Sequence, residues 1–145
     1  MPDEYLARNV ARETGKRIIV PQSKTTAVPL SFEFESTNGH GRPGVVGWHG
    51  RCEVHEKFTV EDIRTVRAQF PDVAIVSHPE CSPEVVAASD FSGSTTAMIR
   101  YVEESTAPHY LLLTECSMGD NIIASNPDKD MLRLCNVRCP HMNQI

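Results

Sequence analysis

Apolar residues follow two alternating patterns along the chain. Short continuous apolar runs at 73–76 and 110–113 are typical of strands that are buried on both faces of a sheet. Elsewhere apolar residues recur at the spacing of one helix face, as Ile63, Val66 and Phe70 do. Strand and helix patterns alternate with short connections, which indicates a parallel sheet covered by helices. We therefore predict an α/β fold, a three-layer αβα domain with a short parallel sheet.

Capping signals place the ends of the predicted helices. Thr59 and Asp62 stand at the two positions of a capping box, and Ser82 precedes a proline at the first helical position. Gly15 is typical of a helix end. Together the patterns predict helices at 3–14, 59–70, 83–88, 93–102 and 116–126, and strands at 16–20, 45–48, 73–76, 110–113 and 131–134.

Three junctions between a strand and the following helix carry polar or reactive side chains. They lie at 78–81, 93–95 and 114–116. The carboxyl ends of parallel strands meet at one edge of a sheet, and ligands gather outside that edge. We therefore expect the three junctions to open on the same edge.

Composition limits the class of protein. The chain has 145 residues, enough for one domain with its own core, and 40% of them are hydrophobic. A net charge of -5 argues against a general nucleic-acid surface. No apolar run reaches membrane-spanning length and the N-terminus lacks a secretory pattern, so we expect a cytoplasmic protein with neither nucleic acid nor membrane as partner. The segment 21–43 is polar and rich in Gly, Pro, Ser and Thr, which predicts a long exposed loop.

The chain has five cysteines, an odd number without a secretory signal, which argues against a disulfide framework. Cys52 lies just before a predicted helix, and Cys139 follows the last predicted strand and precedes Pro140. Cysteines followed by proline recur among iron–sulfur ligands, whereas free cysteines are most often simply buried. The spacing alone leaves metal ligation and structural burial equally open. A further hypothesis is a zinc site formed by Cys135, Cys139 and His141.

Two pairs of residues at the predicted sheet edge can carry chemistry. His78 and Glu80 could act as an acid–base pair, or His78 could hydrogen-bond locally while Glu80 caps the helix that begins near Ser82. Ser94 and Thr95 stand at a helix start, where they could bind a phosphate or carboxylate or form an ordinary cap. The residues alone leave both questions open.

Six segments, in this order along the chain, resemble the quinolinate synthase family, the NadA-type enzymes of NAD biosynthesis. Together the segments are specific, although no single one is. The resemblance covers most of the chain from residue 44 onward. The segments are 2–7, 50–58, 74–81, 90–99, 114–116 and 139–142.

The resemblance implies three similar α/β domains around a pseudo-threefold axis. Each domain gives one cysteine to a central [4Fe–4S] cluster, which keeps one iron position open for substrate. The residues so implied are Cys52 and Cys139 as cluster ligands, His78 as a substrate-binding catalytic residue, Glu80 as the acid–base group, and Ser94 and Thr95 as residues that bind the carboxylate or phosphate of the substrate.

The family reaction condenses iminoaspartate with dihydroxyacetone phosphate to quinolinate, phosphate and water, with the cluster as a Lewis acid. By resemblance, residues 1–51 are the end of a second domain, 52–139 a complete third domain, and 140–145 a truncated C-terminal segment. We expect the family enzyme to be about twice as long as this chain. The chain would then need the missing N-terminal half as a partner, or form a homodimer. The alternative is an inactive fragment or an α/β interaction module.

Overall fold

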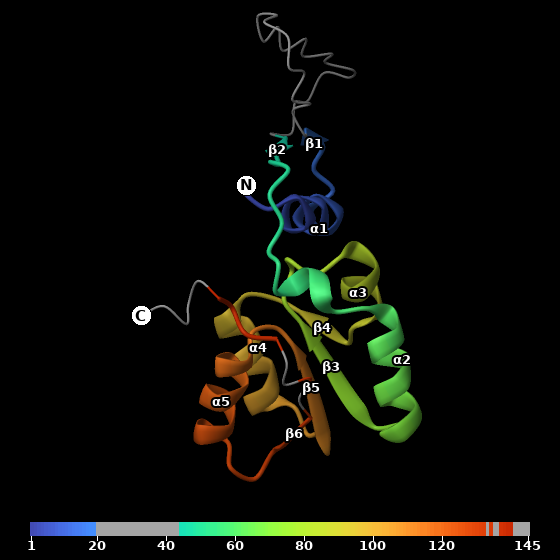
Figure 1. The fold of residues 1–145 in the computed structure, drawn as a ribbon, viewed down its shortest axis with the longest axis vertical. Coiled ribbons are helices and arrows are strands. Elements are labelled where there is room, and N and C mark those ends of the chain that lie inside the picture. Colours follow the sequence, from blue (N-terminus) through green and yellow to red (C-terminus); the bar gives the residue numbers. More distant parts are fainter. Residues whose placement is uncertain (20–43, 133, 135–136, 141–145) are drawn as a thin grey trace, which may run out of the picture.

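Helices and strands alternate along the chain, as the sequence predicts. The computed structural model describes residues 1–19, 44–132, 134 and 137–140 (Figure 1). The predicted loop at 21–43 and the two zinc candidates Cys135 and His141 lie outside these residues. The elements are α1 Glu4–Thr14, β1 Ile18–Ile19, β2 Val45–Val46, η1 His55–Lys57, α2 Val60–Gln69, β3 Val73–Ser77, α3 Pro83–Ala88, β4 Phe91–Ser92, α4 Thr95–Glu104, β5 His109–Leu113, α5 Cys116–Ser125 and β6 Asp130–Leu132.

The strands form two parallel sheets. The larger has the order β4-β3-β5-β6, and β1 pairs with β2 in a separate small sheet. Every strand pair of the larger sheet is parallel, so the prediction of an α/β fold is confirmed. The junctions after β3, β4 and β5 consequently open on one edge, as expected. β1 and β2 are shorter than predicted, and β4 and η1 were not predicted.

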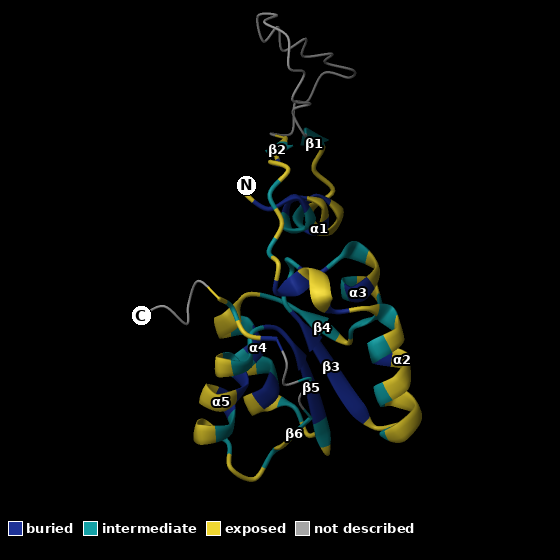
Figure 2. Cartoon of the chain, in the orientation of Figure 1, coloured by how far each residue is buried: buried dark blue, intermediate teal, exposed yellow. Residues whose placement is uncertain are grey.

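The central strands β3 and β5 have apolar side chains on both faces. On one face Ile75 and Leu111 pack with residues of α2 and α3, and on the other Val76 packs with residues of α4 and α5. This gives three layers, helices on either side of a sheet, with the two central strands buried (Figure 2). Successive side chains of a strand point to opposite faces of the sheet. Because both faces are buried here, β3 and β5 are continuous apolar runs in the sequence.

The predicted helix caps are present. Thr59 and Asp62 form a reciprocal capping box at the start of α2. The carboxylate of Asp3 caps α1 by accepting from the amide of Leu6 at 2.7 Å. Gly15 ends α1 with a left-handed φ of 66°, a conformation that glycine adopts without steric cost. Among the described residues, no helix is long and apolar enough to cross a membrane.

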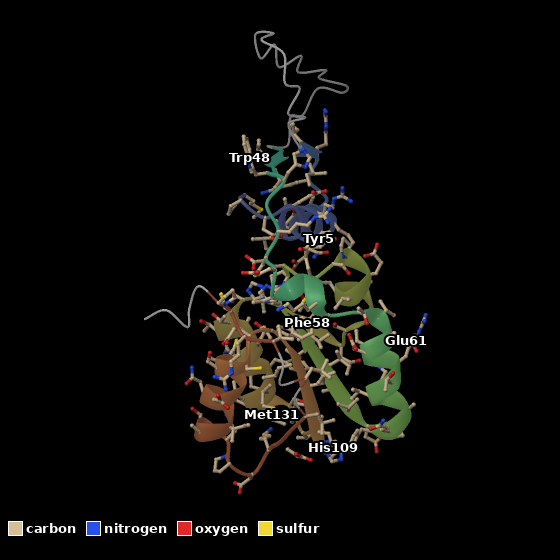
Figure 3. The ribbon with its side chains drawn as sticks, viewed as in Figure 1. Tyr5, Trp48, Phe58, Glu61, His109 and Met131 are labelled. Atoms are coloured by element: carbon tan, nitrogen blue, oxygen red, sulfur yellow. The ribbon has the colours of Figure 1, made fainter. Side chains whose placement is uncertain are left out.

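α1 lies beyond the carboxyl edge of the larger sheet and contacts α3 (Figure 1). His109, the first residue of β5, lies at the opposite end of the molecule from Tyr5 on α1 (Figure 3). The strands therefore run toward α1, and their carboxyl ends meet the segment that carries Phe58. This arrangement places α1, η1 and the three junctions around one edge of the sheet.

Candidate functional site

The site is built on the turn that follows β3. The amide of His78 donates to the carbonyl of Leu113 at 3.2 Å, which ties the turn to the end of β5. The amide of Cys81 donates to the carbonyl of His78 at 2.9 Å and closes the turn. The hydroxyl of Ser82, which accepts from the amide of Val85, caps α3. Glu80 is therefore not the cap of this helix, and its carboxylate is available to the site.

His55 on η1 brings a second imidazole to this turn. Its ring stacks on that of His78, with the centroids 4.5 Å apart and an angle of 15° between the planes. Its Nδ1 lies 3.0 Å from Oε2 of Glu80, and its Nε2 lies 3.2 Å from the hydroxyl of Thr114. Both His55 and Thr114 are buried. Two imidazoles and a carboxylate thus lie together at the carboxyl edge of the sheet.

We predicted no role for His55 from the sequence. It lies three residues after Cys52 in a motif that was recognised, and this spacing places two side chains on the same side of a helical turn. That signal indicates His55 as a partner of Cys52. The stacking on His78 is a contact between distant parts of the chain, which no local pattern shows.

The charges of the site follow from its contacts. The neighbouring His55 is the largest influence on Glu80, and together with His78 it holds the pKa of this carboxyl below its ordinary value. Burial, followed by the charge of His55, lowers the pKa of His78. At neutral pH Glu80 is therefore a carboxylate and His78 a neutral imidazole. In this state Glu80 can accept a proton, and His78 can donate or accept a hydrogen bond.

Cys52 lies at the same place, held through its backbone. Oδ2 of Asp3 accepts from the amide of Cys52 at 2.9 Å, while Oδ1 of Asp3 caps α1. Ligand atoms of Cys52, His55 and Glu80 all lie within 4.8 Å of one another. One carboxylate therefore fixes the position of Cys52 relative to the first helix, and these three side chains could hold a metal.

The other cysteines differ in their surroundings. Cys139 is half-buried and packs against the same apolar cluster as Cys52. Cys81 is fully buried, its thiol donates to the carbonyl of Leu113 at 3.4 Å, and burial raises its pKa to about 12. A thiol that stays protonated inside a core is a structural residue. Cys116 begins α5 and is half-buried.

The predicted anion-binding pair lies at the same sheet edge but on the surface. The hydroxyl of Ser94 accepts from the amide of Ala97 at 3.3 Å and caps α4, and Thr95 is exposed. On the neighbouring strand ends, the buried hydroxyls of Ser77 and Ser92 have no hydrogen-bond partner among the described residues. Ser94 thus acts as an ordinary cap in this structure, and its predicted contact with substrate stays a prediction.

The fold and the site define an α/β protein with a thiol, two imidazoles and a carboxylate at the carboxyl edge of a parallel sheet, the edge where ligands of such sheets bind. The chain belongs to the NadA family, described as quinolinate synthetase A protein, whose family model matches residues 1–145. The resemblance seen in the sequence is therefore confirmed.

Curated relatives match over the whole chain. It is 44% identical over 145 residues to quinolinate synthase 2 of Mesorhizobium japonicum, covering 36% of that protein. It is 44% identical to quinolinate synthase of Agrobacterium fabrum and 45% identical to that of Xylella fastidiosa, covering 34% of each. The chain spans about a third of the length of these relatives. The expectation that the family enzyme is about twice as long as the chain was therefore wrong, because these relatives are longer.

Proposed function

We propose that this chain is the C-terminal part of a quinolinate synthase. The proposed whole enzyme condenses iminoaspartate with dihydroxyacetone phosphate to quinolinate in de novo NAD biosynthesis in the cytoplasm. The observation that carries the proposal is the cluster of Glu80, His55 and His78 beside Cys52 at the sheet edge. The names of the curated relatives support the same activity.

The proposed cofactor is a [4Fe–4S] cluster, and the donors of the chain fit it. Cys52 and Cys139 are half-buried thiols on one apolar cluster, and thiolates are the usual ligands of such clusters. Ligand atoms of His55 and Glu80 lie within 4.8 Å of the thiol of Cys52, so the polar side chains beside this thiol are those that a bound cluster would meet. Cys52 and Cys139 would hold two of the irons, and a third ligand would come from the missing part. The bound cluster supplies a Lewis-acidic iron that polarises an oxygen of the substrate.

In this mechanism the side chains of the chain move protons and orient the substrate. Glu80, kept as a carboxylate by its neighbours, accepts a proton from the condensing substrate. His55 orients Glu80, and the neutral His78 hydrogen-bonds to the substrate. The exposed hydroxyls of Ser94 and Thr95, at the start of α4, bind the carboxylate or phosphate.

Anaerobic reconstitution with iron and sulfide tests the proposal. The chain is loaded alone and together with the remaining part of a full-length relative, and iron content, absorbance and quinolinate are measured. We expect a cluster and product only in the mixture. Cys52→Ser and Cys139→Ser should each abolish cluster formation there, whereas Cys116→Ser should not. Unchanged iron uptake in the first two variants would overturn the ligand assignment.

The role of Glu80 is tested in the same mixture. Glu80→Gln removes the proton acceptor but keeps the size of the side chain, so the rate of quinolinate formation should fall at least about 100-fold while iron content is unchanged. Glu84→Gln, on the exposed surface of α3, is the matched control and should keep the activity. Equal activity of the two variants would contradict the proposed role.

The alternative is an inactive fragment or an α/β interaction module. It is favoured by the coverage, because the chain matches only about a third of each relative. If neither a cluster nor quinolinate forms in the mixture, this alternative replaces the proposed enzyme.

A further inference from the structure

We propose that one face of the small sheet, the face formed by Val46 and Trp48, is a docking surface for the missing part of the enzyme. A helix of that part covers this face. The proposal rests on the proposed function, because it takes the chain to be one part of a quinolinate synthase. It concerns side chains that take no part in the candidate site.

Exposed apolar side chains gather at this place. Among the described residues, the large apolar side chains that are exposed are Met1 at 44%, Val46 at 52% and Trp48 at 64%. The amino group of Met1 donates to the carbonyl of Val46 at 2.5 Å, and the amide of Trp48 donates to the carbonyl of Met1 at 2.9 Å. Figure 3 shows Trp48 beside β2, at the opposite end of the molecule from His109. A single exposed apolar residue is normal, whereas a group of them indicates a contact surface.

Burial alternates along residues 45–48. Val45 is half-buried and Gly47 is buried, whereas Val46 and Trp48 are exposed. Successive residues of an extended segment point to opposite faces of a sheet, so Val46 and Trp48 share one face. α1 contacts both strands of the small sheet and covers the face of Val45 and Gly47. The face of Val46 and Trp48 is therefore the open one.

A parallel sheet with an open face is incomplete. Parallel sheets occur almost only with helices on both faces, as in the larger sheet of this molecule. β1 and β2 are parallel, and each has two residues. A pair of strands is marginally stable at best without a packed layer. The small sheet thus requires a second covering layer, and in this type of fold that layer is a helix.

The missing part of the enzyme is the occupant that suits this face. The chain spans about a third of the length of the matched relatives, so the rest of the enzyme has enough residues for such a layer. A second copy of the chain suits it less, because one aromatic side chain buries about 150–250 Å², whereas a stable complex buries about 800 Å² on each partner. Within one polypeptide a small surface suffices, since the covalent link raises the effective concentration.

Hydroxyl-radical footprinting tests this surface, because Trp48 is the only tryptophan of the chain. The chain is oxidised alone and together with the remaining part of a full-length relative, without iron, sulfide or substrate. We expect oxidation of Trp48 to be at least about fivefold slower in the mixture, since a packed interface excludes water. An unchanged rate in a mixture that has formed a complex would overturn the proposal. Slower oxidation on concentrating the chain alone would overturn it too, because the surface would then bind a second copy.

A pair of variants tests the contribution of this side chain to binding. Trp48→Lys places a charge on the surface and should weaken binding of the remaining part at least about tenfold. Gln69→Lys adds the same charge at an exposed position of α2 and should leave binding unchanged. Trp48 is largely exposed, so both variants should keep the far-ultraviolet circular dichroism of the unaltered chain. Equal binding of the two variants would contradict the proposed surface.

A fused protein keeps the test independent of variant folding and of association between separate parts. The chain replaces the matching third of the Agrobacterium fabrum relative in one polypeptide, and the oxidation rate of Trp48 is compared with that in the free chain. Equal rates would overturn the surface even if the fused protein forms quinolinate. Slower oxidation in a fused protein that forms no quinolinate would support the surface and contradict the proposed activity. The two failures are therefore distinguishable.

Discussion

Asn9 lies on α1, yet its side chain holds the turn that carries Glu80. Nδ2 of Asn9 donates to the carbonyl of Pro79 at 2.9 Å and to that of Cys81 at 3.0 Å. The residue is buried, so both donors would be costly to leave unpaired. A single amide thus fixes the backbone on both sides of the proposed proton acceptor.

Replacing this amide by a carboxylate should therefore destabilise the protein more than removing it. Asn9→Asp would place acceptor oxygens against two carbonyls and bury a charge, with an expected loss of about 2–4 kcal/mol in the free energy of unfolding. Asn9→Ala only removes the donors and should cost about 1–3 kcal/mol. Urea denaturation measures both values.

The control for this pair is Asn121→Asp, the same substitution at an exposed position of α5, which should change stability by less than about 0.5 kcal/mol. If Asn9→Asp proves as stable as the unaltered chain, the amide of Asn9 does not hold the turn.

At the scale of elements, the start of α1 is joined to the segment that leads to Cys52. Asp3 and Gly50 form a parallel bridge, and the amide of Glu4 donates to the carbonyl of Gly50 at 2.8 Å. The two backbones are so close that a Cβ on Gly50 would lie 2.4 Å from the carbonyl oxygen of Pro2. Only glycine permits this approach without a backbone movement.

Gly50→Ala should therefore separate the start of α1 from the Cys52 segment. We expect a loss of about 1–3 kcal/mol in unfolding free energy, since a backbone atom cannot rotate away as a side chain can. Faster hydrogen exchange at the amide of Cys52, which donates to Asp3, should accompany the loss. Gly44→Ala is the matched control, because its Cβ would lie 3.4 Å from the nearest atom, an ordinary contact. Equal exchange in the two variants would contradict the proposed role of Gly50.

The elements that the sequence predicted are those with local signals. The capping box of Thr59 and the proline after Ser82 act within one turn, so they can be recognised from the sequence alone. β4 has two residues, and it is a strand only because it pairs with the end of β3. No run of two residues shows a period, so this strand could not be predicted.

The site residues that could be predicted are likewise those that stand in local sequence motifs. His78, Glu80 and Cys52 stand in recognisable motifs, and the structure brings ligand atoms of Glu80 and Cys52 together with His55. The contacts of His55 with His78, and of Asn9 with the turn, join residues that are distant in sequence. Such contacts are fixed by tertiary packing, which one sequence does not reveal.

At the scale of the whole molecule, the larger sheet and both of its helix layers come from elements between α2 and β6. The residues before Cys52 contribute α1 and the small sheet of β1 and β2. Asp3 connects α1 with Cys52, and Asn9 connects it with the turn before α3. Arg12 donates to the carbonyl of Pro83, the first residue of α3. The predicted domain boundary between residues 51 and 52 would separate α1 and the small sheet from the elements between α2 and β6. This boundary stays a prediction.

A shortened chain of residues 52–145 tests that boundary. Because the sheet core is complete without α1, we expect native helix and strand content by circular dichroism. Loss of the hydrogen bonds from Asn9 and to Asp3 should lower the unfolding free energy by about 2–4 kcal/mol, at roughly 1 kcal/mol for each bond. The loss should be local, with faster hydrogen exchange at 78–81 than in β3 and β5. If exchange instead rises equally throughout the sheet, α1 belongs to the same cooperative unit and the boundary at residue 52 is wrong. The proposed site would then be part of one folding unit that includes α1, rather than the edge of a domain that folds by itself.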